Sequence, residues 1–196
     1  MAAAYVGTID NIKLSANWMA AAGHPGEDAA LYDAVEAVSS LCQSLGVSIP
    51  VGKDSLSMKT VWESAGDKKA VVAPPSLIVT AFAPVEDIRK TVTPALVDDA
   101  DTDLLMIDLG YGHCFLGGSA YGQVHKHMVG RSPDLQHPEL LVGMFNTIQS
   151  LLRDDILLAY HDRSDGGLFA TLAEMMFASR HGVTVDVDEM VIERRN

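Results

Sequence analysis

Apolar residues recur every three or four positions from Glu27 to Leu45, and this spacing is the period of an amphipathic helix. Gly46 follows the last apolar position, where a glycine commonly forms the C-terminal cap of a helix. Extended segments flank the helix, with "AAAYVGTIDNIKLSANW" before it and "VSIPV" after it. This order of strand, helix and strand predicts a mixed fold of the α+β or α/β class.

The rest of the chain continues the mixture of strands and helices. Strands are predicted at 75–85, 103–110, 156–160 and 183–188, and the polar stretch "ESAGDKK" is predicted to be a solvated turn before the first of them. Helices are predicted from Pro138, with Leu141, Phe145, Ile148 and Leu152 on one face, and from Leu168, with Leu172, Met175 and Ser179. The charged segment 87–103 contains Pro94 and places a domain boundary near residue 98.

Composition excludes several classes of protein. The 196 residues are 48% hydrophobic, enough for a packed core, and the net charge of −12 argues against a sequence-independent grip on nucleic acid. A metal ion could still bridge such a chain to an anionic small molecule. Two cysteines without a CxxC motif, no signal peptide and no apolar run of roughly 20 residues predict a cytoplasmic protein without a disulfide scaffold, a thiolate zinc site or a membrane span.

The stretch "HDRSDGG" at 161–167 concentrates polar residues between a predicted strand and a predicted helix. Ligands of α/β proteins usually bind at such a junction, where Asp162 could coordinate Mg²⁺ as a hard oxygen ligand. Ser164 and the amides near Gly166 and Gly167 could bind a phosphate at the start of the helix. The alternative is structural: Ser164 or Asp165 caps the helix, and the glycines allow a tight turn.

A second polar cluster lies in "SIPVGKDSLSMK" at 48–59. It is not a P-loop, because that motif needs glycine at Val47 and serine or threonine at Asp54. Gly52, Lys53 and Ser55 could still hold a phosphate through an amide, an ammonium group and a hydroxyl, although a solvated turn explains them equally well. The pair His125 and His127 lacks a third metal ligand and is interpreted as surface residues.

Three segments, "LSANWMAAAGHPGEDAALYDAV", "GVSIPVGKDSLSMKT" and "LLAYHDRSDGGLFATLAEMMFAS", closely resemble the phosphoribosylformylglycinamidine synthase family in its long single-chain bacterial form. That family belongs with the aminoimidazole ribonucleotide synthetase-like superfamily. The resemblance runs along essentially the whole chain and implies a fragment of the second synthetase-like copy in a longer parent. Residues 1–98 are then the later part of an N-terminal domain, and 99–196 the first part of a C-terminal domain. An open start and an uncapped, charged end agree with a fragment.

The resemblance also implies a reaction, in which formylglycinamide ribonucleotide, ATP and glutamine give formylglycinamidine ribonucleotide, ADP, phosphate and glutamate. It assigns Asp162 to Mg²⁺, Ser164 and Gly52 to nucleotide, and Ser55 and Lys53 to substrate. Lys53 stands where the family has a metal-binding asparagine, and an ammonium group cannot ligate Mg²⁺. The family's glutamate and asparagine metal ligands are expected before Ala2, and no glutaminase cysteine is present, so the fragment is predicted to be inactive by itself.

Its partners are then formylglycinamide ribonucleotide, ATP, glutamine and the remaining domains of the same enzyme. Nucleic acid and membrane are not expected to be partners. The alternative to a ligase fragment is a non-catalytic structural or interaction module, in which the loop at 161–167 only caps a helix. The two differ in one observable property: a ligase requires Asp162 and Ser164 to face one cleft with Gly52 or another cluster near a domain edge. The two pseudo-equivalent sites of the longer enzyme can also divide these residues between two clefts.

Overall fold

The structure is a computed structural model that describes residues 1–127 and 130–187, and the chain forms two compact units. The first unit contains Met1 and Val6–Glu86, and the second contains Ala2–Tyr5 and the chain from Asp87 onward. The boundary predicted near residue 98 stays a prediction. The mixed α and β fold that the sequence predicts is confirmed.

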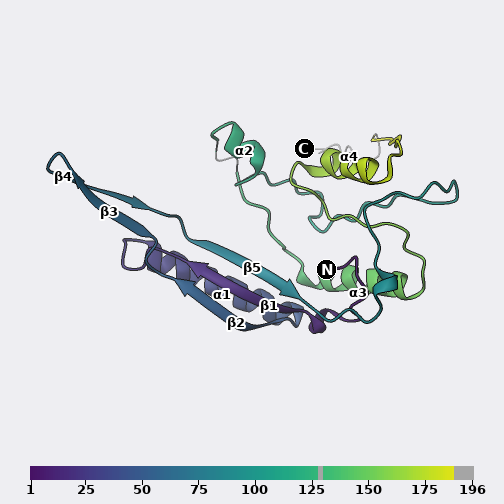
Figure 1. Ribbon diagram of the computed structural model, residues 1–196, viewed down its shortest axis with the longest axis horizontal. Helices are drawn as coiled ribbons and strands as arrows, with labels where there is room; N and C mark the ends of the chain where they lie inside the picture. Colours follow the sequence, from purple (N-terminus) through teal and green to yellow (C-terminus); the bar gives the residue numbers. More distant parts are fainter. Residues whose placement is uncertain (128–129, 188–196) are drawn as a thin grey trace. The chain divides into compact units, whose positions relative to one another are not determined.

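The first unit is built on a three-stranded sheet with the order β2-β1-β5 (Figure 1). The central strand β1 (Lys13–Met19) pairs in parallel with β2 (Ser48–Ser55) and antiparallel with β5 (Ser76–Phe82). Helix α1 (Glu27–Leu45) connects the two parallel strands and lies along the sheet. It has the predicted bounds, and Gly46 caps it in the left-handed conformation with φ of 72°.

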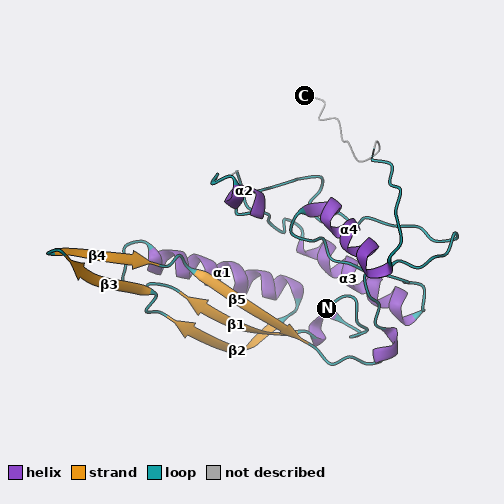
Figure 2. Ribbon diagram, turned by 45° about the horizontal axis from the view of Figure 1, so that its top comes forward, coloured by secondary structure: helices purple, strands orange, loops and turns teal. Residues whose placement is uncertain are grey.

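A hairpin of β3 (Lys59–Ser64) and β4 (Asp67–Val72) extends from this unit (Figure 2). The sequence predicted only a solvated turn here, so the two strands are a correction. Ala65 and Gly66 form the connection with φ of 55° and 86°, and a tight hairpin turn of this handedness needs two positive φ angles. The hairpin is hard to predict from the sequence because its strands carry many charged residues. Two of them, Glu63 and Lys68, form an opposite-charge cross-strand pair.

The second unit contains the helices α2 (Ala120–Val124), α3 (Pro138–Arg153) and α4 (Gly167–Ser179). Short 3₁₀ turns occur at Ile9–Asn11 in the first unit and at Ile88–Lys90 in the second. Helix α3 follows the predicted pattern, because its buried side chains are Phe145, Ile148, Gln149 and Leu152. Gln149 donates hydrogen bonds to the carbonyl oxygens of Ala2 and Ala4 at 3.0 and 3.2 Å, which ties the start of the chain to this helix.

Three predicted strands are wrong in the structure. Residues 103–110, 156–160 and 183–187 form no strand, and residue 188 lies outside the described residues. A strand needs a neighbour for its backbone hydrogen bonds, and none of these segments forms a ladder with another described segment. Many of their apolar side chains are exposed, as Leu105 is 82% and Ile156 62% exposed. No described helix has the length and apolar character needed to cross a membrane.

Candidate functional site

Near the start of the loop at 161–167, the carboxylate of Asp162 is held in place by Tyr160. The hydroxyl of Tyr160 donates a hydrogen bond of 2.8 Å to Oδ1 of Asp162. Partial burial of Tyr160, together with this hydrogen bond and the negative charge of Asp162, raises the pKa of the Tyr160 phenol. Asp162 itself is exposed, and its Oδ2 makes no hydrogen bond to any residue that the structure describes. One oxygen of Asp162 is therefore fixed, and the other is open to a ligand.

Two further side chains of the loop, those of His161 and Ser164, are hydrogen-bonded to Glu174 of α4. Its Oε2 accepts a hydrogen bond from Oγ of Ser164 at 2.5 Å and another from Nε2 of His161 at 2.7 Å. These two hydrogen bonds, that from Ser164 first, lower the pKa of Glu174. The carboxylate is thus ionised at neutral pH and accepts from both partners.

The helix start contradicts the cap alternative. Helix α4 has Gly166 as its N-cap residue, with φ of 109°, and no side chain caps it, so neither Ser164 nor Asp165 has that role. Instead, the amide of Ser164 donates to Oγ1 of Thr171 at 2.9 Å, one turn inside the helix. The first turn of α4 therefore keeps backbone N–H groups that a side-chain cap would otherwise satisfy.

The sequence missed Tyr160, Thr171 and Glu174, which shape this loop. Thr171 and Glu174 stand three residues apart on α4 and so share one face of the helix, which is the available sequence signal. The signal is weak, because a polar pair at this spacing is equally typical of a solvated helix face.

The loop fits a magnesium ion only in part. Within residues 1–127 and 130–187, no three His, Cys, Asp or Glu side chains are grouped closely enough to hold a metal. Mg²⁺ commonly uses one or two protein carboxylates and completes its shell with phosphate oxygens and water. Asp162, with one open oxygen, suits such a shared site and does not form a closed protein cage.

A second carboxylate lies in the electrostatic field of the loop. Asp108 accepts hydrogen bonds from the amides of Gly110 and Gly112 at 2.8 and 2.7 Å. These bonds lower the pKa of Asp108, and the positive charge of Arg163 lowers it further. The positive charge of Arg163 and the negative charge of Asp108 therefore attract each other. Both carboxylate oxygens of Asp108 already hold a turn, so the geometry gives this residue a structural role.

The cluster at 52–55 lies in strand β2, so the solvated-turn alternative is wrong for Gly52, Lys53 and Ser55. Nζ of Lys53 donates to Oγ of Ser55 at 3.0 Å, as expected for side chains two positions apart on one face of a strand. A shallow pocket at this end of the strand is lined by Trp18, Gly52, Lys53 and Asp54. Lys53 and Ser55 are therefore brought together, but among the described residues no carboxylate and no helix side chain makes a hydrogen bond to either side chain.

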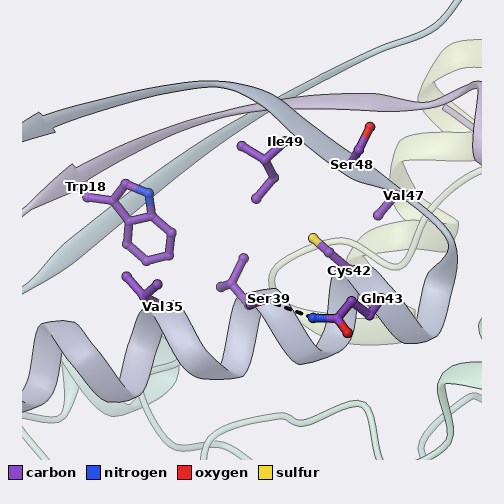
Figure 3. Close-up of a pocket in the computed structure, with 9 residues that line it drawn as sticks. Trp18, Val35, Ser39, Cys42, Gln43, Val47, Ser48 and Ile49 are labelled. Atoms are coloured by element: carbon purple, nitrogen blue, oxygen red, sulfur yellow. Dashed lines mark hydrogen bonds between the residues drawn. The ribbon is translucent and has the colours of Figure 1, made fainter.

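A different hollow lies between α1 and the sheet (Figure 3). Trp18 and Ile49 face Val35 and Cys42 across it, and Gln43 donates a 3.2 Å hydrogen bond to Ser39 at its edge. Burial raises the pKa of the Cys42 thiol, which favours the unreactive protonated form. The hollow therefore lies beside a thiol that stays protonated at neutral pH.

Among the described residues, the two histidines of "HKH" have no group of metal ligands around them. The ring of His125 packs on that of Tyr121, with the ring centroids 4.6 Å apart, and the amide of His127 donates to the carbonyl of Gly122. His125 is the C-cap residue of helix α2, and both histidines are exposed, as expected for surface residues.

Two family models match the chain and together cover most of it. Residues 1–84 match the FGAR-AT PurM_N-like domain, and residues 109–196 match the C-terminal domain of AIR synthase related proteins. These domains belong to an ATP-binding, ligase-type family of purine biosynthesis. These two matches confirm the resemblance seen in the sequence: the chain contains a domain of the FGAR-AT PurM_N-like family followed by a C-terminal domain of the AIR synthase related family.

Proposed function

We propose that this chain is part of a ligase that converts formylglycinamide ribonucleotide, glutamine and ATP into formylglycinamidine ribonucleotide, glutamate, ADP and phosphate. Other domains of the same enzyme then supply the glutaminase nucleophile and the missing metal ligands. The two matched domains support this proposal through their family. The observation that carries the site assignment is the carboxylate of Asp162, with Oδ1 held by Tyr160 and Oδ2 uncommitted.

In this proposal the loop at 161–167 binds a magnesium nucleotide. Asp162 contributes one oxygen to Mg²⁺. The uncapped N-terminal end of α4, which carries partial positive charge, attracts the negatively charged phosphates. Mg²⁺, when bound, neutralises charge on the phosphate oxygens. Ser164 is placed at the same loop by its hydrogen bonds to Glu174 and Thr171. The protein groups therefore orient the nucleotide, and this chain supplies no nucleophile of its own.

The strand cluster has a separate role in the proposal. Lys53 and Ser55 bind an anionic group of the substrate, and Gly52 allows a nucleotide or substrate to approach the backbone closely. Apart from Gly52 and its two chain neighbours, no heavy atom of the described residues lies within 4 Å of the position that a Cβ at Gly52 would occupy, so there is open space in front of it. Lys53 acts by charge and not as a metal ligand.

The proposal is tested in the longer enzyme that carries this chain. Asp162→Asn should purify with less bound ADP and Mg²⁺ than the wild type, because an amide oxygen is a weaker ligand than a carboxylate. Asp165→Asn is the matched control, since Asp165 lies in the same loop and is also exposed. Nucleotide analysis and metal analysis of the purified proteins measure both ligands. Equal ADP and Mg²⁺ in wild type and Asp162→Asn would contradict the assignment.

A further inference from the structure

The hydrogen bonds around Ser164 restrict what its hydroxyl can offer to a ligand. A serine hydroxyl has one proton to donate and two lone pairs to accept with. In the structure that proton is donated to Oε2 of Glu174 across 2.5 Å. The amide of Ser164 is also occupied, because it donates to Oγ1 of Thr171. Ser164 therefore presents lone pairs, and no proton, to anything that enters the loop.

The carboxylate of Glu174 enforces this direction. An ionised carboxylate only accepts hydrogen bonds, so neither Ser164 nor His161 can reverse its bond to Oε2. The two donors converge on one oxygen of a residue that is ten positions or more along the chain, on helix α4. The helix therefore fixes the orientation of a hydroxyl in the loop.

We propose that Glu174 is a positioning residue that makes Ser164 a hydrogen-bond acceptor, so that Ser164 contacts an O–H group of the ligand and not a phosphate oxygen. Phosphate oxygens at neutral pH are acceptors and would meet only lone pairs at Ser164. The matching O–H groups of a magnesium nucleotide are a water bound to the metal and a ribose hydroxyl. This inference rests on the proposed function, because it presumes that the loop binds a magnesium nucleotide.

The first test is a double-mutant cycle on the affinity of the isotopically labelled 196-residue chain for ADP with Mg²⁺, followed by NMR titration. Ser164→Ala and Glu174→Ala should each weaken binding by about 10-fold, as loss of an outer-shell partner of a metal site typically does. The double variant should bind no more weakly than Ser164→Ala, because Glu174 acts through Ser164. Glu36→Gln, at an exposed position of α1, is the control and should bind like the wild type. Additive losses would contradict the positioning role.

The second test identifies the group that Ser164 contacts. The effect of Ser164→Ala is measured with ADP and Mg²⁺, with ADP and a chelator, and with 2′,3′-dideoxy-ADP and Mg²⁺. If the contact is a metal-bound water, the effect disappears with the chelator. If it is a ribose hydroxyl, the effect disappears with the dideoxy nucleotide. An effect that persists in all three titrations identifies a phosphate contact and overturns the inference.

The two proposals fail in different ways. If Asp162→Asn and Ser164→Ala both bind ADP and Mg²⁺ as the wild type does, or if the loop does not respond to the nucleotide, the proposed function is wrong. If those variants bind weakly while Glu174→Ala binds normally, only the positioning role is wrong. The long-range ¹H–¹⁵N spectrum of His161 gives an independent readout, since its Nε2 must carry a proton beside Glu174 and should lose this preference in Glu174→Ala.

Discussion

The two polar clusters of this chain differ in how their side chains are held. At 161–167, Asp162 is fixed by Tyr160, and Ser164 and His161 are fixed by Glu174 of the following helix. At 52–55, the only side-chain hydrogen bond among the described residues joins Lys53 to Ser55 within one exposed strand. The side chains of the first cluster are held by neighbouring residues of the same unit, whereas the second cluster is a lysine and a serine on an exposed strand. A preorganised site loses less side-chain entropy when it binds.

The largest expected effect concerns the chemistry that neither cluster can perform alone. The 196-residue chain should form no formylglycinamidine ribonucleotide from formylglycinamide ribonucleotide, ATP, Mg²⁺ and ammonium. Phosphoryl transfer depends on holding nucleotide, metal and acceptor in one geometry, and misplacement by about 1 Å can cost on the order of 100-fold in rate. Product-dependent release of ADP is the measurement, with the longer enzyme as the positive control. Turnover comparable to that of the longer enzyme would show that the chain is a complete catalytic unit.

Removing the phenol that holds Asp162 tests preorganisation at the first cluster. Tyr160→Phe keeps the ring but loses the 2.8 Å hydrogen bond to Oδ1, so the carboxylate gains freedom. The affinity of the chain for Mg²⁺ with ADP should fall by about 10-fold, the lower end of the effect of second-shell substitutions. Calorimetric titration measures it, and Tyr32→Phe, at an exposed position of α1, is the control. Unchanged affinity would mean that Asp162 needs no support.

A smaller effect is expected at the second cluster. In the longer enzyme, Ser55→Ala should raise the Michaelis constant for a phosphorylated substrate by about 5-fold, the equivalent of one ordinary hydrogen bond of about 1 kcal/mol. Ser57→Ala is the control, because Ser57 is exposed and follows strand β2. Steady-state kinetics with ATP and with the ribonucleotide distinguish the two ligands. If both constants are unchanged, the cluster is a structural strand end.

The smallest effect separates the clusters by pH. The pKa of Glu174 is lowered by its hydrogen bonds with Ser164 and His161, so these contacts are fully formed above the ordinary glutamate pKa of about 4.3 and are lost as the pH falls through the lowered value. The Lys53–Ser55 hydrogen bond contains no carboxylate. The amide signals of Ser164 and Thr171 should therefore shift in acid, and that of Ser55 should not follow the same titration curve. Identical curves at both clusters would point to global acid unfolding.

Local patterns in the sequence predicted the parts of the fold that local physics determines. Helix α1 and its Gly46 cap follow from residues within one periodic segment, and α3 buries three of the four apolar positions predicted for its face. The predicted strand at 103–110 fails because a ladder depends on a neighbour that apolar composition does not specify. The hairpin was missed for the opposite reason, since its charged strands lack an apolar alternation.

The same distinction between local patterns and contacts distant in the sequence applies to the candidate site. Asp162 and Ser164 were found because they lie together in a short glycine-bearing loop. Glu174 was missed because its contacts span ten and thirteen positions, and they depend on how α4 folds back on the loop. The sequence thus indicated the candidate ligand-binding residues, but not the residues that hydrogen-bond to them and orient them.

The most direct test of the account is an amide chemical-shift map of the 196-residue chain during titration with ADP and Mg²⁺. The account predicts saturable shifts at 160–167 and in the first turn of α4, with Asp162→Asn abolishing most of the response. Lys53 and Ser55 should respond to a phosphorylated substrate and not to the titration with ADP and Mg²⁺. Shifts confined to 52–55, or a response at the loop that Asp162→Asn leaves unchanged, would contradict the claim that the preorganised loop is the magnesium nucleotide site.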